Sequence, residues 1–232
     1  MRIQSLLQNK ITKISNQAEV LNYAYSQFVF IVHPKVFSPI EFVSTKFCLD
    51  HLPQMVVNKT FLEIGSGTGI ISLLIGLGSA NPESNLATDI STFAVTNTQA
   101  NFNKYNLETE VRLSDLFDKI SDLEKFDIIF WNHPFLQHFE NTSNQTQNSS
   151  QLIADLNYEN LSRFFRKSKK HLNTEGSIIL CTSKTIGNWS KILKIAIKYG
   201  FSKEPCILAK NEDLKYLNQD SFFDLCLIRF DL

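Results

Sequence analysis

A glycine-rich turn is the first part of the sequence whose residues and spacing could do chemistry. Residues 61–71 read Phe-Leu-Glu-Ile-Gly-Ser-Gly-Thr-Gly-Ile-Ile, which places three alternate glycines between two apolar runs. Glycines between a strand and a helix let the backbone turn tightly and approach a ligand closely. A dinucleotide fingerprint needs its third glycine at position 70, which is Ile70, so the G-x-G-x-x-G pattern does not match. The turn itself consists of Gly65, Ser66, Gly67, Thr68 and Gly69.

An acid next to this turn indicates the charge of the ligand. Glu63 lies two residues before the first glycine, close to where the following helix would present its N-terminus. A pyrophosphate at that helix end would be repelled by Glu63, whereas a ligand with an ammonium and a sulfonium group would not. The sequence therefore favours a cationic ligand over a polyanionic one.

A second acid follows at a spacing typical of nucleoside binding. Asp89 closes an apolar run 20 positions after Gly69, and a carboxylate at about this distance binds ribose hydroxyls in nucleotide-binding α/β folds. Two other roles stay open for Asp89, namely an N-cap for a helix that starts near Ser91 and an ordinary turn residue.

The tetrapeptide Asn132-His133-Pro134-Phe135 suggests the reaction. It follows the apolar run 126–131, and open α/β sheets bind ligands at the carboxyl ends of such strands. A planar nitrogen is a poor nucleophile because its lone pair is delocalised; an enzyme helps by accepting both N–H protons and stacking a ring on the plane. Asn132 offers a side-chain carbonyl and His133 a main-chain carbonyl, while Pro134 stiffens the turn and Phe135 supplies the ring. The alternative is a strand-ending turn, which Asn and Pro favour on their own.

The elements that must position these residues alternate as βαβ units from residue 60 onward. This pattern predicts a doubly wound, mostly parallel α/β sheet of seven strands, similar to a Rossmann fold. Only the polar stretch 210–220 separates the last two strands, which predicts antiparallel pairing and a reversed last strand. The expected strands are 60–64, 85–89, 109–113, 126–131, 176–182, 201–209 and 222–230, and the expected helices are 69–77, 91–105, 151–172 and 188–199.

Two parts of the chain are expected. Residues 1–58 form a short N-terminal helical cap and approach segment, with an amphipathic helix candidate, an apolar run at 28–32 and a helix at 42–52. Residues 59–232 form the ligand-binding domain, and a chain of 232 residues is long enough to bury its own core without disulfides or metal.

Composition narrows the classes of partner. The formal net charge is zero, so the totals give no attraction to nucleic acid or to an anionic membrane. No signal peptide or membrane-spanning run is found, which fits the cytoplasm. The four cysteines have no metal-ligand spacing, so we expect small core residues and no metal; they are Cys48, Cys181, Cys206 and Cys226.

Residues 62–69, Leu-Glu-Ile-Gly-Ser-Gly-Thr-Gly, resemble the first motif of class I S-adenosylmethionine-dependent methyltransferases, and the likeness of the strand pattern extends to the C-terminus. The resemblance implies that Glu63 and the backbone of the turn from Gly65 to Gly69 hold the methionine end of S-adenosylmethionine. It implies that Asp89 binds the ribose and that Ile90, next to Ser91, covers one adenine face.

The resemblance also extends to the loop after the third strand. Asp115, followed by Leu116, lies where the family binds the adenine amino group, and an ordinary solvated loop acid is the alternative. Asn132 is expected beside the cofactor as well as beside the acceptor.

Asn132-His133-Pro134-Phe135 resembles the Asn-Pro-Pro-Tyr/Phe motif of amino-methyltransferases, which include HemK-type release-factor glutamine methyltransferases and adenine-N6 or guanine-N2 enzymes. His133 stands where most relatives have Pro; other residues are acceptable because the main-chain carbonyl carries the function, and a general base is the alternative role. Residues 32–39, leading into Thr45, resemble the approach segment that crosses over the cofactor, although Lys46 replaces the usual acid.

The methyl acceptor stays open. Residues 1–58 leave too little room for the helical recognition domain of longer release-factor enzymes, which favours a small molecule, with 136–150 as a candidate lid. An RNA or DNA base and a protein glutamine are alternatives. The basic run within 163–170 could contact phosphates but is better explained as a solvated helix face. A non-catalytic, cofactor-binding regulatory or scaffold subunit is the other class of function.

Overall fold

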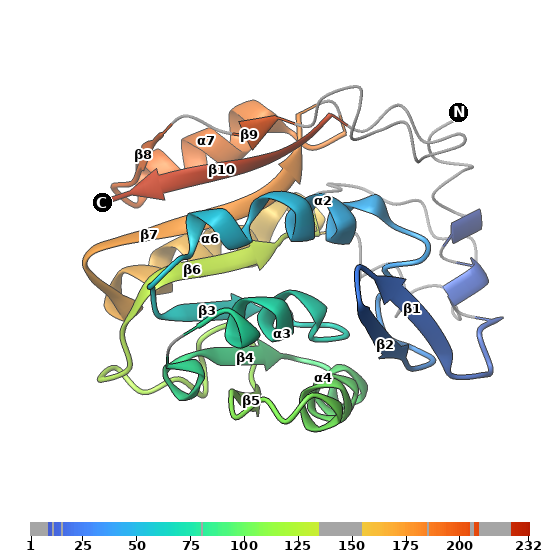
Figure 1. Ribbon diagram of the computed structural model, residues 1–232. Coiled ribbons are helices and arrows are strands. Elements are labelled where there is room, and N and C mark those ends of the chain that lie inside the picture. The colour runs from blue at the N-terminus through green and yellow to red at the C-terminus, as the bar shows by residue number, and fades with distance from the viewer. Residues whose placement is uncertain are drawn as a thin grey trace.

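The alternating apolar runs fold into one large sheet with helices on both faces (Figure 1). The computed structural model describes residues 9–204, 207–208 and 224–232, apart from residues 11, 15, 80, 135–154 and 185. The strands of the sheet are β3 (Phe61–Ile64), β4 (Leu86–Asp89), β5 (Glu110–Leu113), β6 (Phe126–Asn132), β7 (Leu172–Ser183), β8 (Ser202–Lys203), β9 (Ile207–Leu208) and β10 (Leu225–Asp231). The helices are α2 (Val43–His51), α3 (Ile70–Leu77), α4 (Thr92–Lys104), α6 (Glu159–Ser168) and α7 (Trp189–Lys198).

The strand order is β5-β4-β3-β6-β7-β10-β8, and β9 also pairs with β10. Strands β3 to β7 are parallel, whereas β10 runs antiparallel to β7, β8 and β9. This confirms the predicted doubly wound, mostly parallel sheet with a reversed last strand; the expected strand 201–209 occurs as β8 and β9. Because the chain returns from β5 to pair β6 with β3, a ligand crevice is expected at the carboxyl ends of these two strands.

The two faces of the sheet carry separate apolar cores. Helices α2, α3 and α4 lie on one face and α6 and α7 on the other (Figure 1). Side chains alternate between the two cores along β6 because successive residues of a strand point to opposite faces. Phe130 packs with the core under α2 and α3, and Ile129 and Trp131 pack with the core under α6 and α7. Asn132 is next in this alternation and lies on the α2 side.

Most helix and strand ends lie within one residue of the expected ones, and two elements differ more clearly among the described residues. The helix expected at 151–172 is α6, flanked by the 3-10 turns η3 (Leu156–Tyr158) and η4 (Lys169–His171), and residues 151–154 lie outside the described part. Strand β7 starts at Leu172, earlier than the expected residue 176, because Leu172 already pairs with Phe126 of β6.

The N-terminal part contains a hairpin that the sequence analysis did not predict. Strand β1 (Leu21–Tyr25) pairs antiparallel with β2 (Phe28–Val32), which corresponds to the apolar run at 28–32. The helix expected at 42–52 is present as α2. The division of the chain at residue 58 stays a prediction.

Side chains of α4 hold the free backbone edge of β2. Asn101 donates through Nδ2 to the main-chain oxygen of Ile31 at 2.9 Å and of Thr68 at 2.8 Å, and its Oδ1 accepts from the Ile31 N–H at 2.8 Å. Side chains four residues apart on the helix meet alternate residues of the strand. The pairs are Asn97 with His33, Asn101 with Ile31 and Tyr105 with Val29.

Three cysteines, Cys48, Cys181 and Cys226, are free and buried among apolar side chains, and Cys206 lies outside the described residues. Within the described ranges, no group of three or more His, Cys, Asp or Glu side chains could hold a metal ion. In the same ranges, no helix is long and apolar enough to cross a membrane.

Removing the Asn101 side chain should destabilise the fold. Asn101→Ala leaves the Ile31 N–H and the Thr68 carbonyl without this partner, while the Ile31 carbonyl keeps its bond from Asn97, and we expect a loss of about 1–3 kcal/mol in the free energy of unfolding. Urea unfolding of the wild type and the variant measures this loss. Asn103→Ala is the control, because Asn103 is exposed on the same helix and, within the described residues, its side chain bonds only the Gln99 side chain. Equal losses in the two variants would contradict the role given to Asn101.

Candidate functional site

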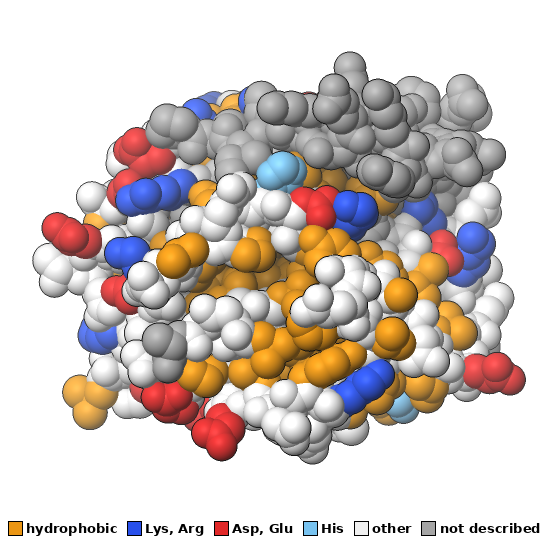
Figure 2. Space-filling model, viewed as in Figure 1, with side chains coloured by type: hydrophobic (Ala, Val, Ile, Leu, Met, Phe, Trp, Pro, Cys, Tyr) orange, Lys and Arg blue, Asp and Glu red, His pale blue; other side chains and the backbone are white. Residues whose placement is uncertain are grey.

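A cavity of about 470 Å³ opens at the carboxyl ends of β3, β4 and β6. Its lining comes from the turn after β3, the ends of β4 and β6, the loop after β5, the segment leading into α2, and the start of α6. On the face seen in Figure 2, apolar side chains gather in the middle, and charged side chains lie mostly toward the edges. Every predicted site residue that the structure describes lines the cavity except Gly69, and Phe135 lies outside the described residues.

The turn after β3 has a conformation that requires glycine. Gly65, Gly67 and Gly69 have φ angles of +70°, +56° and +75°, a region that residues with a Cβ rarely adopt. At Gly69 a Cβ would also lie 2.6 Å from Thr98 Cγ2 of α4. Thr98 Oγ1 donates to the main-chain oxygen of Gly67 at 3.1 Å and lies 3.0 Å from Ser66 Oγ. Helix α4 therefore fixes the turn from behind.

Glu63 is buried at the end of β3, where its side chain both bonds the start of α3 and lines the cavity. Its Oε2 accepts from the main-chain N–H of Ser72 at 3.0 Å and from the Ser72 hydroxyl, which caps the first turn of α3. Its Oε1 makes no hydrogen bond within the described residues, and the side chain lines the cavity. Burial raises the pKa of Glu63 to about 8, with a smaller contribution from the Asp89 charge, although the bonds from Ser72 oppose the rise. The carboxyl group is thus poised to ionise beside a cation.

Asp89 ties the end of β4 to the glycine turn. Its Oδ2 accepts from the Gly67 N–H and its Oδ1 from the Ser91 N–H, both at 2.9 Å. Burial raises the pKa of Asp89, while these backbone donors oppose the rise. The N-cap of α4 is Ser91, whose hydroxyl accepts from the Ala94 N–H, so Asp89 is not that cap. Ile90 is 69% exposed at the mouth of the cavity, where it offers an apolar surface.

Asp115 forms an ion pair at the far end of the cavity. Its Oδ2 lies 2.8 Å from Arg163 of α6, and both side chains are about one third exposed, at 39% and 32%. Such a half-exposed pair contributes little stability. The neighbouring Leu116 is buried at a φ of +51° and also lines the cavity. The structure therefore brings Asp115 into the cavity with one carboxylate oxygen bonded to a guanidinium.

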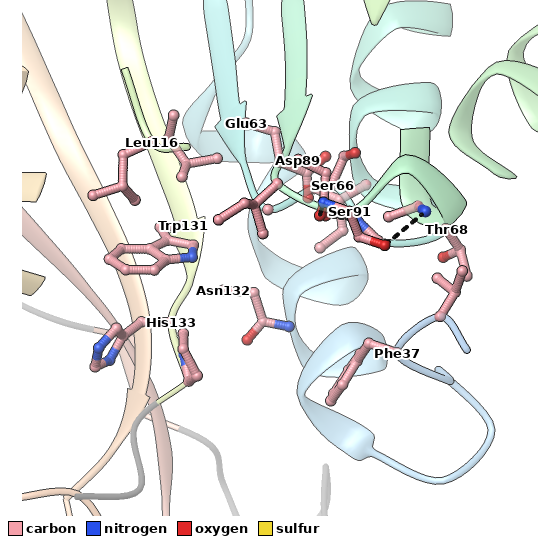
Figure 3. Close-up of a pocket in the computed structure, with 18 of the residues that line it drawn as sticks. Phe37, Glu63, Ser66, Thr68, Asp89, Ser91, Leu116, Trp131, Asn132 and His133 are labelled. Atoms are coloured by element: carbon pink, nitrogen blue, oxygen red, sulfur yellow. Dashed lines mark hydrogen bonds between the residues drawn. The ribbon is translucent and has the colours of Figure 1, made fainter. Parts of the chain in front are cut away.

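Asn132 projects into the cavity from the end of β6. In Figure 3 its carboxamide lies between the glycine turn and the segment that carries Phe37. Nδ2 donates to Ser44 Oγ of α2 at 3.3 Å. No hydrogen bond to Oδ1 is present among the described residues. The acceptor oxygen of Asn132 is therefore available to a ligand in the cavity.

The His133 ring points away from Asn132 and is completely buried (Figure 3). Its Nε2 lies 3.2 Å from Asp155 Oδ2, and Asp155 also accepts the N–H groups of Asn160 and Leu161 at the start of α6. Burial lowers the pKa of His133, against the effect of Asp155. Nδ1 is buried and has no partner within the described residues. This environment favours an anchoring role for the ring over a general base, and leaves the main-chain carbonyl to serve the site.

Several lining residues were not among the predicted site residues. Phe37 and Phe42 stack with ring centroids 4.6 Å apart, and Phe37 Cβ is 4.0 Å from the place of a Cβ on Gly67. Thr45 lines the same wall, so residues of the segment 32–39 and of α2 face the glycine turn, as its resemblance to an approach segment suggested. Trp131 was missed because an apolar side chain at a strand end looks like core; its Nε1 is 3.2 Å from the place of a Cβ on Gly65.

Three of the five basic residues within 163–170, which belong to α6 and η4, are paired with acids. Besides Arg163 with Asp115, Lys167 pairs with Asp118, and Lys170 lies 3.3 Å from Asp122. These contacts neutralise much of the charge that could attract phosphates. They favour the expectation of a solvated helix face.

Comparisons with known proteins agree with this geometry. The family model described as methyltransferase small domain matches residues 27–200. A bifunctional methyltransferase of Rickettsia prowazekii is 31% identical over 166 residues, which are 66% of this chain and 31% of that protein. A putative protein N5-glutamine methyltransferase of Methanocaldococcus jannaschii is 29% identical over 71% of this chain and 80% of its own length.

A solved structure shares the fold. The 16S rRNA N2 G1207 methyltransferase of T. thermophilus, in complex with AdoMet and guanosine, superposes with a TM-score of 0.57 at 15% identity, over 92% of this chain and 50% of that one. The present chain thus spans about a third of the bifunctional relative and half of this structure. Because the family model covers residues 27–200, from β2 to the end of α7, the chain belongs to the methyltransferase small domain family.

Proposed function

We propose that this protein transfers a methyl group from S-adenosylmethionine to a planar nitrogen, either an amide or an exocyclic amine. The observation that carries the proposal is the position of Asn132. Its free carboxamide oxygen lies in the same cavity as the glycine turn, on the strand next to the one that the turn follows. Membership of the methyltransferase family supports the same conclusion.

The chemistry of the cavity fits S-adenosylmethionine. Three acidic side chains line it, those of Glu63, Asp89 and Asp115, and they suit a cation better than a pyrophosphate, although Lys35 and Arg163 also line the cavity. Glu63 and the turn would hold the methionine end, Asp89 the ribose hydroxyls, and Ile90 with Leu116 the adenine faces. Asp115 keeps one oxygen for the adenine amino group, since Arg163 occupies the other.

Bound S-adenosylmethionine supplies an electrophilic methyl group. The chain's own residues then have to position the nucleophile. Asn132 Oδ1 and the main-chain oxygen of His133 accept the two N–H protons of the acceptor, which directs the nitrogen lone pair along the transfer path. Pro134 lines the cavity and fixes the turn, and Phe135 is proposed to stack on the acceptor plane.

The class of acceptor follows from labelling. Incubation with S-[methyl-³H]-adenosylmethionine and fractionated cell extract distinguishes protein, RNA and small-molecule acceptors. The relative named a protein N5-glutamine methyltransferase makes the protein fraction the first to test, and a small molecule or a nucleic acid base are the alternatives. Label in no fraction would favour the non-catalytic subunit.

Replacing Asn132 should abolish most turnover and spare cofactor binding. For Asn132→Ala we expect the rate of label transfer to fall by about 10²- to 10³-fold, because an oriented acceptor is lost in the transition state. Titration calorimetry with S-adenosylmethionine should give nearly the wild-type affinity. Asn103→Ala, outside the cavity, is the control; an unchanged rate in Asn132→Ala would reject the catalytic assignment.

Replacing Asp89 should weaken the binding of the nucleoside ligand. Asp89→Ala removes a charged acceptor that holds Gly67 and is proposed to bind ribose, and we expect about 10- to 100-fold weaker binding of S-adenosylhomocysteine. Asp89→Asn keeps one carbonyl oxygen, so its affinity for S-adenosylhomocysteine should lie between those of the wild type and Asp89→Ala. Tight binding by Asp89→Ala would count against the ribose role.

Cofactor affinity should depend on pH through Glu63. Its pKa of about 8 means that the empty cavity holds a mostly protonated carboxyl group at neutral pH. A bound cation favours the carboxylate, so binding releases a proton, and affinity should rise with pH up to about 8, by at most about tenfold per pH unit, and then level off.

The matched control is Glu63→Gln, which keeps an oxygen for Ser72 but cannot ionise. The amino group of the ligand loses its proton over the same pH range whether the wild type or Glu63→Gln is titrated. The difference between the two calorimetric pH profiles therefore gives the contribution of Glu63. Identical profiles would show that Glu63 does not sense the ligand charge.

A further inference from the structure

A carboxamide at the end of a strand has two orientations with opposite chemistry. Asn132 can present its oxygen to the cavity as an acceptor or its amino group as a donor, and the two differ by a half-turn of the same side chain. An acceptor nitrogen that carries two protons needs the oxygen; the reversed amide would place N–H against N–H. The reaction proposed above therefore needs a second group that fixes this orientation.

Ser44 is placed to do this. It belongs to the first turn of α2, is 6% exposed, and its Oγ lies 3.3 Å from Asn132 Nδ2 although 88 positions separate the two residues. The Ser44 hydroxyl does not cap α2, because the N-cap is Phe42 and has no side-chain bond. Within the described residues, Ser44 is the partner of the Asn132 carboxamide.

The helix that carries Ser44 is itself firmly held. Phe47, Cys48 and Leu49 of α2 are buried in the core that includes Ile179 and Leu225, and α2 contacts α3, β6 and β10. In Figure 3 the Asn132 amide nitrogen points toward α2 while its oxygen points to the other side. The packing of α2 thus holds the Ser44 hydroxyl at a fixed position next to the Asn132 amide, where its oxygen accepts from Nδ2.

We infer that Ser44 is a positioning residue for the methyl transfer: by accepting from Nδ2 it holds the Asn132 oxygen toward the acceptor nitrogen. The inference rests on the proposed function for its catalytic consequence. The hydrogen bond itself can be tested without turnover. Ser44 also lines the cavity, but the role assigned to it here is exerted through the Asn132 amide.

The first experiment uses the protein without acceptor. The side-chain amide of Asn132 is observed in ¹⁵N–¹H spectra and assigned by its loss in Asn132→Asp. Ser44→Ala should increase hydrogen exchange of the Nδ2 protons at least about fivefold, since the bonded proton loses its partner. Ser44→Thr, which keeps the hydroxyl, should exchange like the wild type. Equal exchange in wild type and Ser44→Ala would overturn the inference.

The second experiment measures label transfer from S-[methyl-³H]-adenosylmethionine to total protein and total RNA. Ser44→Ala should lower kcat about 3- to 30-fold, corresponding to the loss of one hydrogen bond, with cofactor affinity within about twofold of wild type. Ser44→Thr should restore kcat. Ser44→Cys keeps the volume but offers only a weak acceptor, so it should be slow like Ser44→Ala even if the cavity left by alanine disturbs folding.

The outcomes separate this inference from the function on which it rests. A slow Asn132→Ala with a fully active Ser44→Ala would overturn the positioning role and leave the proposed function intact. Lost cofactor binding in Ser44→Ala, or no rescue by Ser44→Thr, would also overturn it, because either result assigns Ser44 a structural role. An active Asn132→Ala would reject the proposed function, while the exchange experiment still decides whether Ser44 holds the amide.

Discussion

Helix α4 binds the edge of strand β2 through side chains that are spaced like the residues of the strand, and the geometry of the cavity depends on this contact. Four residues advance about 6 Å along a helix and two residues about 6.7 Å along a strand, so side chains of α4 at every fourth position reach alternate residues of β2. The same helix holds the glycine turn through Thr98 and Asn101. One rigid helix therefore fixes both the turn and the start of the segment that crosses in front of it.

The sheet could be predicted because each of its main strands is marked by residues that are adjacent in the sequence. Strands β3 and β6 and the second half of β7 are short apolar runs, and burial on both faces selects such runs, whereas β5 lies at the sheet edge and is partly exposed. The hairpin could not be predicted, since β1 is mostly exposed and its sequence, Leu-Asn-Tyr-Ala-Tyr, shows no strong apolar pattern. The anchoring role of α4 was also hidden, because Asn97 and Asn101 look like solvent-facing residues until a strand edge is placed against them.

The candidate site was predictable where backbone motifs define it. The glycine turn, Asp89 and Asn132 follow strand ends, and the carboxyl ends of parallel strands meet at one edge. The individual side chains of Ser44 and Arg163 were not predictable, because they reach the cavity only through packing of α2 and α6. Trp131 and His133 illustrate a further limit, since sequence shows that they flank Asn132 but not which side of the sheet their rings occupy.

The contact between His133 and Asp155 joins two points of the chain that are 22 positions apart. Both anchors are buried, so the distance between them is set by the packing of β6 and α6 and not by the segment that connects them. The entropy of closing a loop grows only with the logarithm of its length, about 0.6 kcal/mol for each doubling. The length of a connection between two such buried anchors can therefore change at low cost, because the anchors hold the end of β6 and the start of α6 together by themselves.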